Sequence, residues 1–192
     1  MMHSKYLFIH AFFSSYALPE ASKEIKALIE AAASDKVWKG KIPGDLLWLA
    51  ENLQELISTV FALDKWNEDD RAIITPDWKD YYWPVNTPAL YCGWQKGYNT
   101  WHFMPRHLNK KEFVNPYLAL IKFRNYRIET EWKTIIQQLL HHALIPMGYE
   151  DGNTILQLGK LLHKLVEACH LIEVRTNERI LEMGHKEKSE KA

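Results

Sequence analysis

The sequence has few cysteines and no excess of charge of either sign. It contains two Cys, Cys92 and Cys169, in 192 residues, which excludes a disulfide framework and a zinc site made of four thiolates. The 24 basic residues are balanced by 24 acidic ones, which argues against a protein that coats nucleic acid through its overall charge. A local basic patch is compatible with this balance, because a patch requires only an uneven distribution.

The sequence also lacks long apolar runs and the common catalytic motifs. No run approaches the roughly 20 apolar residues of a membrane-spanning helix, so we expect no membrane partner. The apolar run from residue 6 to residue 13 is interrupted by His10, which favours a buried first helix or strand over a signal peptide. We therefore expect a cytoplasmic location. The absence of G-x-S-x-G, P-loop, G-x-G-x-x-G and H-E-x-x-H motifs favours a protein that is not an enzyme.

Aromatic residues and helical periodicity are what the sequence does have. It contains eight Trp, nine Tyr and seven Phe, and its length predicts one domain over residues 1–192. Apolar residues at three- and four-residue spacing predict helices that start near Pro19, Asp45, Pro116 and Asn153. The last two are joined by a short loop, so we expect them to pack antiparallel. Residues 185–192 are predicted to form a solvated tail.

Residues 66–111 differ from the rest of the chain. Helical periodicity disappears there, and four prolines interrupt the stretch. Residues 90–94 and 100–104 flank a Gln-Lys-Gly-Tyr-Asn turn, a pattern that predicts a short β-hairpin. The predicted fold is therefore mainly α: a helical bundle that carries an aromatic-rich β-hairpin insert between core helices.

The second half of this insert combines aromatic and basic residues. No acidic residue occurs from residue 83 to residue 111. Aromatic faces for stacking bases beside cations for phosphates are typical of single-strand binding, although a Trp in a hairpin often packs on neighbouring helices. The candidate partner-binding residues are Trp94, Lys96, Tyr98, Trp101, Arg106, Lys110 and Lys111.

The last predicted helix carries a different candidate site. His163, Glu167 and His170 lie on one helical face at spacings of i, i+4 and i+7, and Glu167 and His170 form the E-x-x-H pattern of metal-binding bundles. Antiparallel pairing of the last two helices would place Glu131 opposite Glu167. A di-metal bundle needs two such motifs and the chain has one, so an ordinary pairing of polar residues at a helix flank is the alternative.

These observations lead to three hypotheses. The preferred one is a non-enzymatic helical binding module, without a cofactor, that contacts a protein or nucleic acid partner through the aromatic and basic insert. The second is a metal-dependent bundle enzyme that holds a divalent metal with Glu131, His163, Glu167 and His170. The third is a scaffold or oligomer subunit whose insert aromatics belong to the core.

Overall fold

The computed structural model of the protein describes residues 6–34, 37–38, 42–63, 70–74, 88–146, 148–149 and 152–176. Helices dominate these residues and no strand occurs among them, which confirms the predicted mainly α class. The elements are α1 (Leu7–Ser15), α2 (Leu18–Ala32), α3 (Pro43–Ala62), η2 (Asp70–Ala72), α5 (Pro88–Cys92), η3 (Thr100–Phe103), α6 (Lys110–Val114), α7 (Tyr117–Tyr126), α8 (Glu129–Leu144) and α9 (Gly152–Thr176), where η denotes a 3₁₀ helix.

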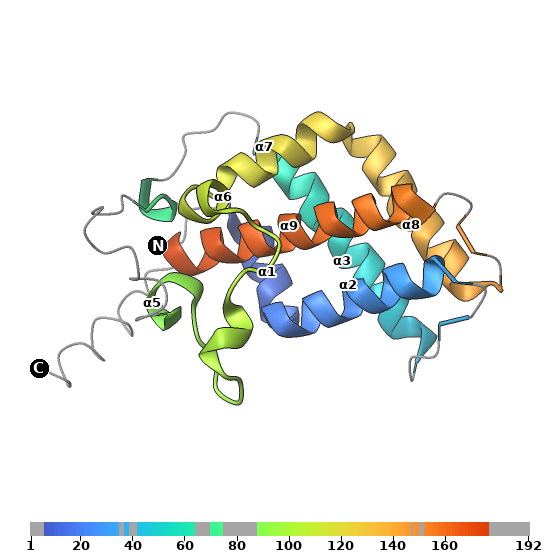
Figure 1. Ribbon diagram of the computed structural model, residues 1–192, viewed down its shortest axis with the longest axis horizontal. Coiled ribbons are helices and arrows are strands. Elements are labelled where there is room, and N and C mark those ends of the chain that lie inside the picture. Colours follow the sequence, from blue (N-terminus) through green and yellow to red (C-terminus); the bar gives the residue numbers. More distant parts are fainter. Residues whose placement is uncertain are drawn as a thin grey trace, which may run out of the picture.

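Helix α9 runs through the middle of the molecule, with α2 below it and α6 and α7 above it (Figure 1). It packs against α1, α2, α5, α6, α7 and η2. Every residue from 165 to 175 is buried, including four polar ones: Glu167, His170, Glu173 and Arg175. A helix that is covered on all sides gives its polar side chains no access to water, so each of them needs a partner inside the protein.

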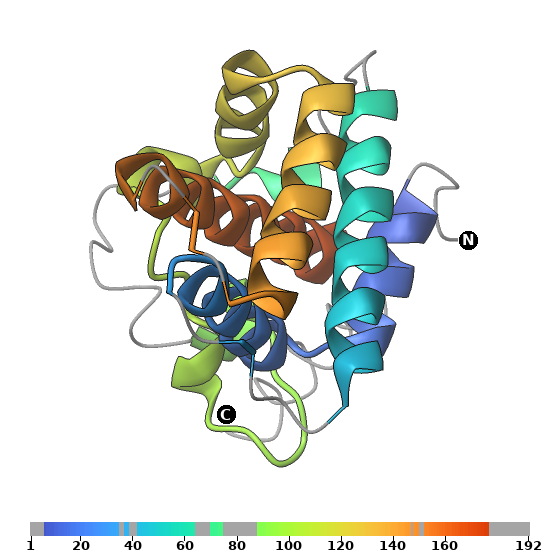
Figure 2. The same ribbon diagram turned by 90° about the vertical axis from the view of Figure 1, so that its right-hand side faces the viewer.

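Helices α3 and α8 lie side by side, and α8 packs mainly against α2 and α3. Figure 2 shows that α8 crosses the direction of α9. The predicted antiparallel pairing of these two helices is therefore wrong. The buried stripe of α8, which includes Trp132, Ile136 and Leu139, is used against α2 and α3, so no apolar face remains for an antiparallel α9.

The long helix predicted from Pro116 is two helices. Helix α7 ends at Tyr126, where Arg127 adopts extended φ and ψ of −152° and 154°, and α8 begins at Glu129. The start of α8 is stabilised by the Glu131 carboxylate, which accepts a hydrogen bond from the Ile128 N–H at 3.3 Å. The Trp132 ring stacks on Phe123 across the break, with centroids 4.0 Å apart, so the two helices share one core.

The predicted β-hairpin is also wrong. Residues 88–92 form helix α5 and residues 100–103 form the 3₁₀ helix η3. Pro88 explains the first difference, because proline is favoured at the first position of a helix and disfavoured inside a sheet. The turn between the two segments is present, with a hydrogen bond from the Tyr98 N–H to the Gln95 carbonyl at 3.2 Å. Residues 66–69 and 75–87 of the predicted insert, and the predicted tail, lie outside the described residues.

The N-terminal apolar run forms helix α1, which places Ile9 and Phe12 in the core and leaves Leu7 and Phe8 exposed. Within the described ranges, no helix is both long enough and apolar enough to cross a bilayer.

Candidate functional site

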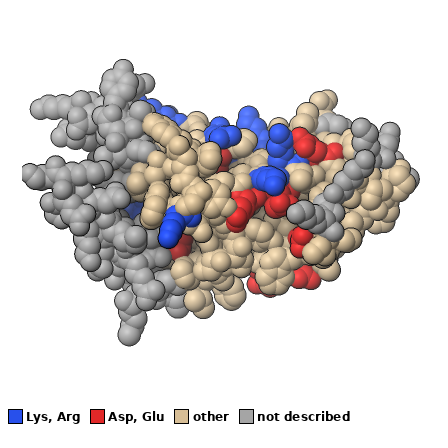
Figure 3. All heavy atoms as spheres, turned by 90° about the horizontal axis from the view of Figure 1, so that it is seen from below, with Lys and Arg blue, Asp and Glu red and all other residues tan. Residues whose placement is uncertain are grey.

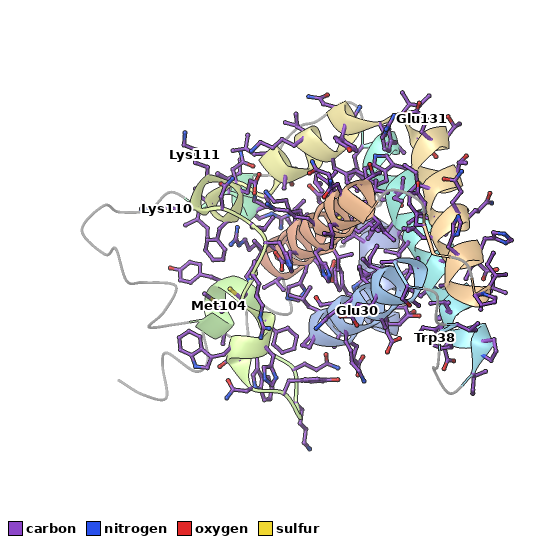
Figure 4. The ribbon with its side chains drawn as sticks, turned by 45° about the vertical axis from the view of Figure 1, so that its right-hand side comes forward. Glu30, Trp38, Met104, Lys110, Lys111 and Glu131 are labelled. Carbon is purple, nitrogen blue, oxygen red and sulfur yellow. The ribbon has the colours of Figure 1, made fainter. Side chains whose placement is uncertain are left out.

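Residues 93–111 cross one flank of the molecule and connect α5 to α6. Gly97 adopts a φ of +95° in the turn, and the Asn99 side chain accepts a hydrogen bond from the Trp101 N–H at 3.0 Å to start η3. Figure 4 shows Met104 partway along this segment and Lys110 and Lys111 on α6. The exposed side chains of the segment include two tryptophans and four Lys or Arg residues, which we name the aromatic–basic surface: Trp94, Lys96, Trp101, Arg106, Lys110 and Lys111.

Two tryptophans of this surface are accessible to solvent. Trp94 is 50% exposed and Trp101 is 48% exposed. Neither ring takes part in an aromatic contact with another part of the described chain. Both indoles therefore present apolar surface to water, which is unusual for the largest side chain in proteins.

Tyr98, which the sequence grouped with these residues, has a different position. Its ring packs edge-on against Phe103, with centroids 5.9 Å apart, and its hydroxyl donates a hydrogen bond to the Glu20 carboxylate of α2. That hydrogen bond is the main reason that the pKa of Tyr98 is raised. Tyr98 thus attaches the turn to α2.

Three basic residues of the surface have no acidic partner among the described residues. No carboxylate of the described chain lies within ion-pair distance of Lys96, Arg106 or Lys111. Lys110 and Lys111 project outward from α6 (Figure 4). Lys96, Arg106 and Lys111 can therefore accept an anionic partner without first breaking an ion pair with another described residue.

Glu167 of α9 holds the loop that carries Arg106. Its carboxylate accepts hydrogen bonds from the backbone N–H groups of Arg106, His107 and Leu108 at 2.9, 2.9 and 3.1 Å. The Nδ1 of His107 donates a further hydrogen bond to the same carboxylate at 2.8 Å. Charge-assisted hydrogen bonds of this kind are stronger than neutral ones, so Glu167 fixes the loop on the central helix.

The ring of a second histidine, His163, stacks on the ring of His107. The His163 ring is parallel to the His107 ring within 10°, with centroids 4.4 Å apart, and its Nδ1 is buried without a hydrogen-bond partner. Burial, together with the neighbouring His107, lowers the pKa of His163 to about 4, although Glu167 opposes the shift. His163 therefore remains neutral at physiological pH.

His170 connects α9 to the end of α5. Its Nε2 donates a hydrogen bond to the Cys92 carbonyl at 2.8 Å, which leaves Nδ1 as an unprotonated, buried nitrogen without a partner. The ring packs against Phe13 and Phe103, with centroids 5.1 and 5.7 Å away. Burial lowers the pKa of His170 to about 4, although the bond to Cys92 favours the charged form.

The chain passes close to α9 immediately after Cys92. Gly93 has a φ of +78°, and a Cβ at this position would lie 2.8 Å from Val174 Cγ2. A side chain would therefore be strained both by its backbone conformation and by a clash. Glycine allows α5 to end against α9 and directs the chain toward Trp94.

Arg175 connects three further segments to α9. Its guanidinium donates hydrogen bonds to the carbonyls of Tyr91, Ala72 and Phe113 at 3.2, 3.0 and 2.8 Å, and it lies 4.9 Å from the centroid of the Phe113 ring. Burial lowers its pKa to about 10. The sequence prediction missed this residue. The signal that could have indicated its role is the position of an Arg next to the apolar stripe of the last predicted helix.

Glu112 anchors α6 in a similar way. It is completely buried and accepts hydrogen bonds from Lys122 at 2.8 Å and Lys164 at 2.6 Å. It also accepts the Asn109 N–H at 3.0 Å, in a capping box at the start of α6. Burial alone would raise its pKa, but these bonds outweigh it and lower the pKa to about 2.

The four candidate metal ligands do not meet. Glu167 binds the loop at residues 106–108, His170 binds α5, and Glu131 caps the start of α8. Figure 4 shows Glu131 near the top of α8, away from the segment that Glu167 holds. No group of three or more His, Cys, Asp or Glu in the described ranges is arranged to hold a metal ion.

The neighbours of Glu131 show why it does not lie opposite Glu167, as antiparallel packing of the last two helices predicted. Glu131 lines an open cleft of about 340 Å³ between α8 and the first turns of α9, together with Arg127 and Leu158. Leu158 precedes Glu167 by nine residues, which is about 13 Å along a helix at ~1.5 Å per residue. Arg127 and Glu131 form no ion pair, because Arg127 lies outside the helix and the i, i+4 geometry does not apply.

No protein-family model, no curated protein and no solved structure matches this chain. Functional inference therefore depends on the geometry described above.

Proposed function

We propose that this protein is a non-enzymatic helical binding module that takes up a macromolecular partner on its aromatic–basic surface. The observation that carries the proposal is the half-exposure of Trp94 and Trp101, on whose rings no other aromatic ring of the described residues packs. Tryptophan and arginine are the residues that most often carry interface energy. Two half-exposed indoles leave roughly 200 Å² of apolar surface in water, which corresponds to about 5 kcal/mol if a partner covers it.

The anchoring of the surface supports the same proposal. Glu167 fixes the loop around Arg106, and His170 and Arg175 fix α5 just before Trp94. A surface that is ordered before binding loses less conformational entropy when the partner arrives. Aromatic residues held in this way are suited to recognition, whereas a scaffold with no partner has no need to expose them.

The test compares tryptophans that are exposed to the same degree on different faces. Immobilised protein is used to retain partners from the source lysate, and retained species are quantified for the wild type, for Trp94→Ala/Trp101→Ala and for Trp48→Ala. Trp48 lies on α3 and is 53% exposed, so it matches the other two in accessibility. We expect a partner that the wild type and Trp48→Ala retain and that the double variant loses.

Two results would contradict the proposal. Equal retention of every species by all three proteins would show that the aromatic–basic surface binds nothing. Shielding of Trp94 and Trp101 from acrylamide in the purified protein, measured by the difference in quenching between the wild type and the double variant, would show instead that these rings are covered by the protein itself. Far-UV circular dichroism of each variant checks that helical content is unchanged.

A further inference from the structure

We infer that the partner of the aromatic–basic surface is a single-stranded nucleic acid. This inference rests on the proposed function, because it assigns a chemical class to the partner of that same surface. It follows from three properties of residues 93–111: their charge, their uncovered ring faces and their fixed backbone.

The charge of this segment differs from that of the whole chain. Residues 93–111 contain four basic residues and no acidic ones, whereas the chain as a whole has a formal charge of zero. Figure 3 shows acidic and basic groups interspersed over the centre of the lower face, so the excess is local. A local cationic surface selects an anionic partner through complementarity.

The carboxylates that touch this segment do not cancel its charge. Glu20 accepts hydrogen bonds from Tyr98 and from the Ala17 N–H. Glu112 is paired with two lysines, and Glu167 is enclosed by loop N–H groups. Glu112 and Glu167 are buried and Glu20 is exposed, and all three are engaged in hydrogen bonds. Lys96, Arg106 and Lys111 form no ion pair with any carboxylate of the described residues.

The tryptophans identify the kind of anion. Trp94 and Trp101 flank the turn at residues 95–99, and no described side chain stacks on either ring. A single strand presents flat bases and phosphates in alternation, so bases can stack on indoles while phosphates reach the cations. A duplex keeps its base faces inside, and an acidic polypeptide supplies carboxylates without a regular series of planar groups. The arrangement therefore matches a single strand best.

The fixed backbone makes the match specific to this segment. The backbone N–H groups of Arg106 and of the next two residues all donate to Glu167, which fixes the position of Arg106. Trp94 follows Gly93, which packs closely against α9. The cations and the indoles are consequently held in one arrangement before the strand binds.

The experiment measures fluorescence anisotropy of a labelled oligouridylate of about a dozen nucleotides, a length within the usual site size of single-strand binders. The full chain is titrated at several salt concentrations, beside a duplex of the same length and labelled polyglutamate. We expect binding to the single strand in preference to the other two. Contact with three phosphates predicts a slope of log affinity against log salt of about −2, from roughly −0.7 per phosphate.

Two sets of variants locate the binding. Trp94→Ala/Trp101→Ala is expected to weaken oligouridylate binding at least about tenfold, because each stacked base contributes to affinity. Lys96→Gln/Arg106→Gln/Lys111→Gln is expected to flatten the salt dependence. Trp48→Ala and Arg127→Gln, which change exposed residues elsewhere, are expected to leave both quantities unchanged. If the tryptophan variant fails to fold, the charge variant alone decides.

Several outcomes overturn the inference. Tighter binding to the duplex would exclude base stacking, and binding that the two surface variants and the controls affect equally would place the site elsewhere. If oligouridylate does not bind while the tryptophan-dependent partner of the retention experiment persists, or if polyglutamate binds better, the partner is a protein. In that case the proposed function stands and the assignment to nucleic acid fails.

Discussion

Acidification should destabilise this protein through His170, which α9 holds neutral in the core. The pKa of the ring is about 4 in the folded chain, against an ordinary value of 6.5. A pKa that folding lowers contributes stability that is fully present above the unfolded value and is lost as the pH falls toward the folded value. The affected range is therefore between pH 6.5 and pH 4.

The size of the effect follows from the two pKa values. Each unit of difference corresponds to about 1.4 kcal/mol, so complete protonation in both states would remove about 3 kcal/mol. Between about pH 7 and about pH 5, the loss is about 2 kcal/mol, because the unfolded ring is almost fully charged at pH 5 while the folded ring is still neutral. That amount is a large part of the stability of a typical domain.

The assay is urea denaturation followed by far-UV circular dichroism at both pH values. The test variant is His170→Gln, whose side-chain amide can still donate to the Cys92 carbonyl but does not titrate. The control is His141→Gln on α8, where the side chain is exposed. We expect His170→Gln to lose about 2 kcal/mol less stability than the wild type on acidification, and His141→Gln to behave as the wild type does.

The same acid-induced loss in the wild type and His170→Gln would refute this reasoning. It would show that His170 is either charged in the folded protein or hydrated there, contrary to its position among Phe13, Phe103 and α5. His163 has a pKa lowered in the same direction, so a His163→Gln variant would then be the next to measure.

Three further predictions concern the groups buried around α9. Glu167→Ala leaves the loop N–H groups and the His107 ring without their acceptor, so it should cost about 3 kcal/mol in urea denaturation and expose the bond after Arg106 to trypsin; an unchanged digestion pattern would contradict the anchoring role. Arg175→Met removes the hydrogen bonds to three carbonyls, of which that of Ala72 is buried, and should cost a similar amount of about 3 kcal/mol, whereas a loss within experimental error would show that water replaces the guanidinium. Burial raises the pKa of both thiols, that of Cys92 to about 12, so both should react with Ellman's reagent only after unfolding; rapid reaction of the native protein would disprove their burial.

The regular helices could be predicted from the sequence because their signals are local. Helix α2 begins next to the predicted Pro19, and α3 begins at Pro43, two residues before the predicted Asp45. Both have apolar residues at helical spacing and proline in the first turn, which are reliable signals. The break at Arg127 was missed because the apolar spacing continues through it, and neither proline nor glycine marks it.

The anchors of the candidate site could not be predicted, because they join residues that are far apart in the chain. Glu167 was predicted as a candidate metal ligand opposite Glu131, but its partners lie at residues 106–108 and are mostly backbone N–H groups. Main-chain donors leave no trace in a sequence. The predicted partner Glu131 depended on antiparallel packing of α8 and α9, which the crossing of these two helices and the packing of α8 on α2 and α3 exclude. The exposure of Trp94 and Trp101, which the sequence left open, is decided by the same long-range contacts.

The central position of α9 has a consequence for synthesis of the chain. The ribosome makes α1 to α8 before α9, yet α1, α2, α5, α6 and α7 all pack on α9. Until α9 emerges, the parts of these helices that pack on it are uncovered, and the hydrogen bonds from Arg175 cannot form. Nascent chains of this kind are prone to aggregate. We therefore expect the complete packing of the earlier helices to form only after the last described helix has been synthesised.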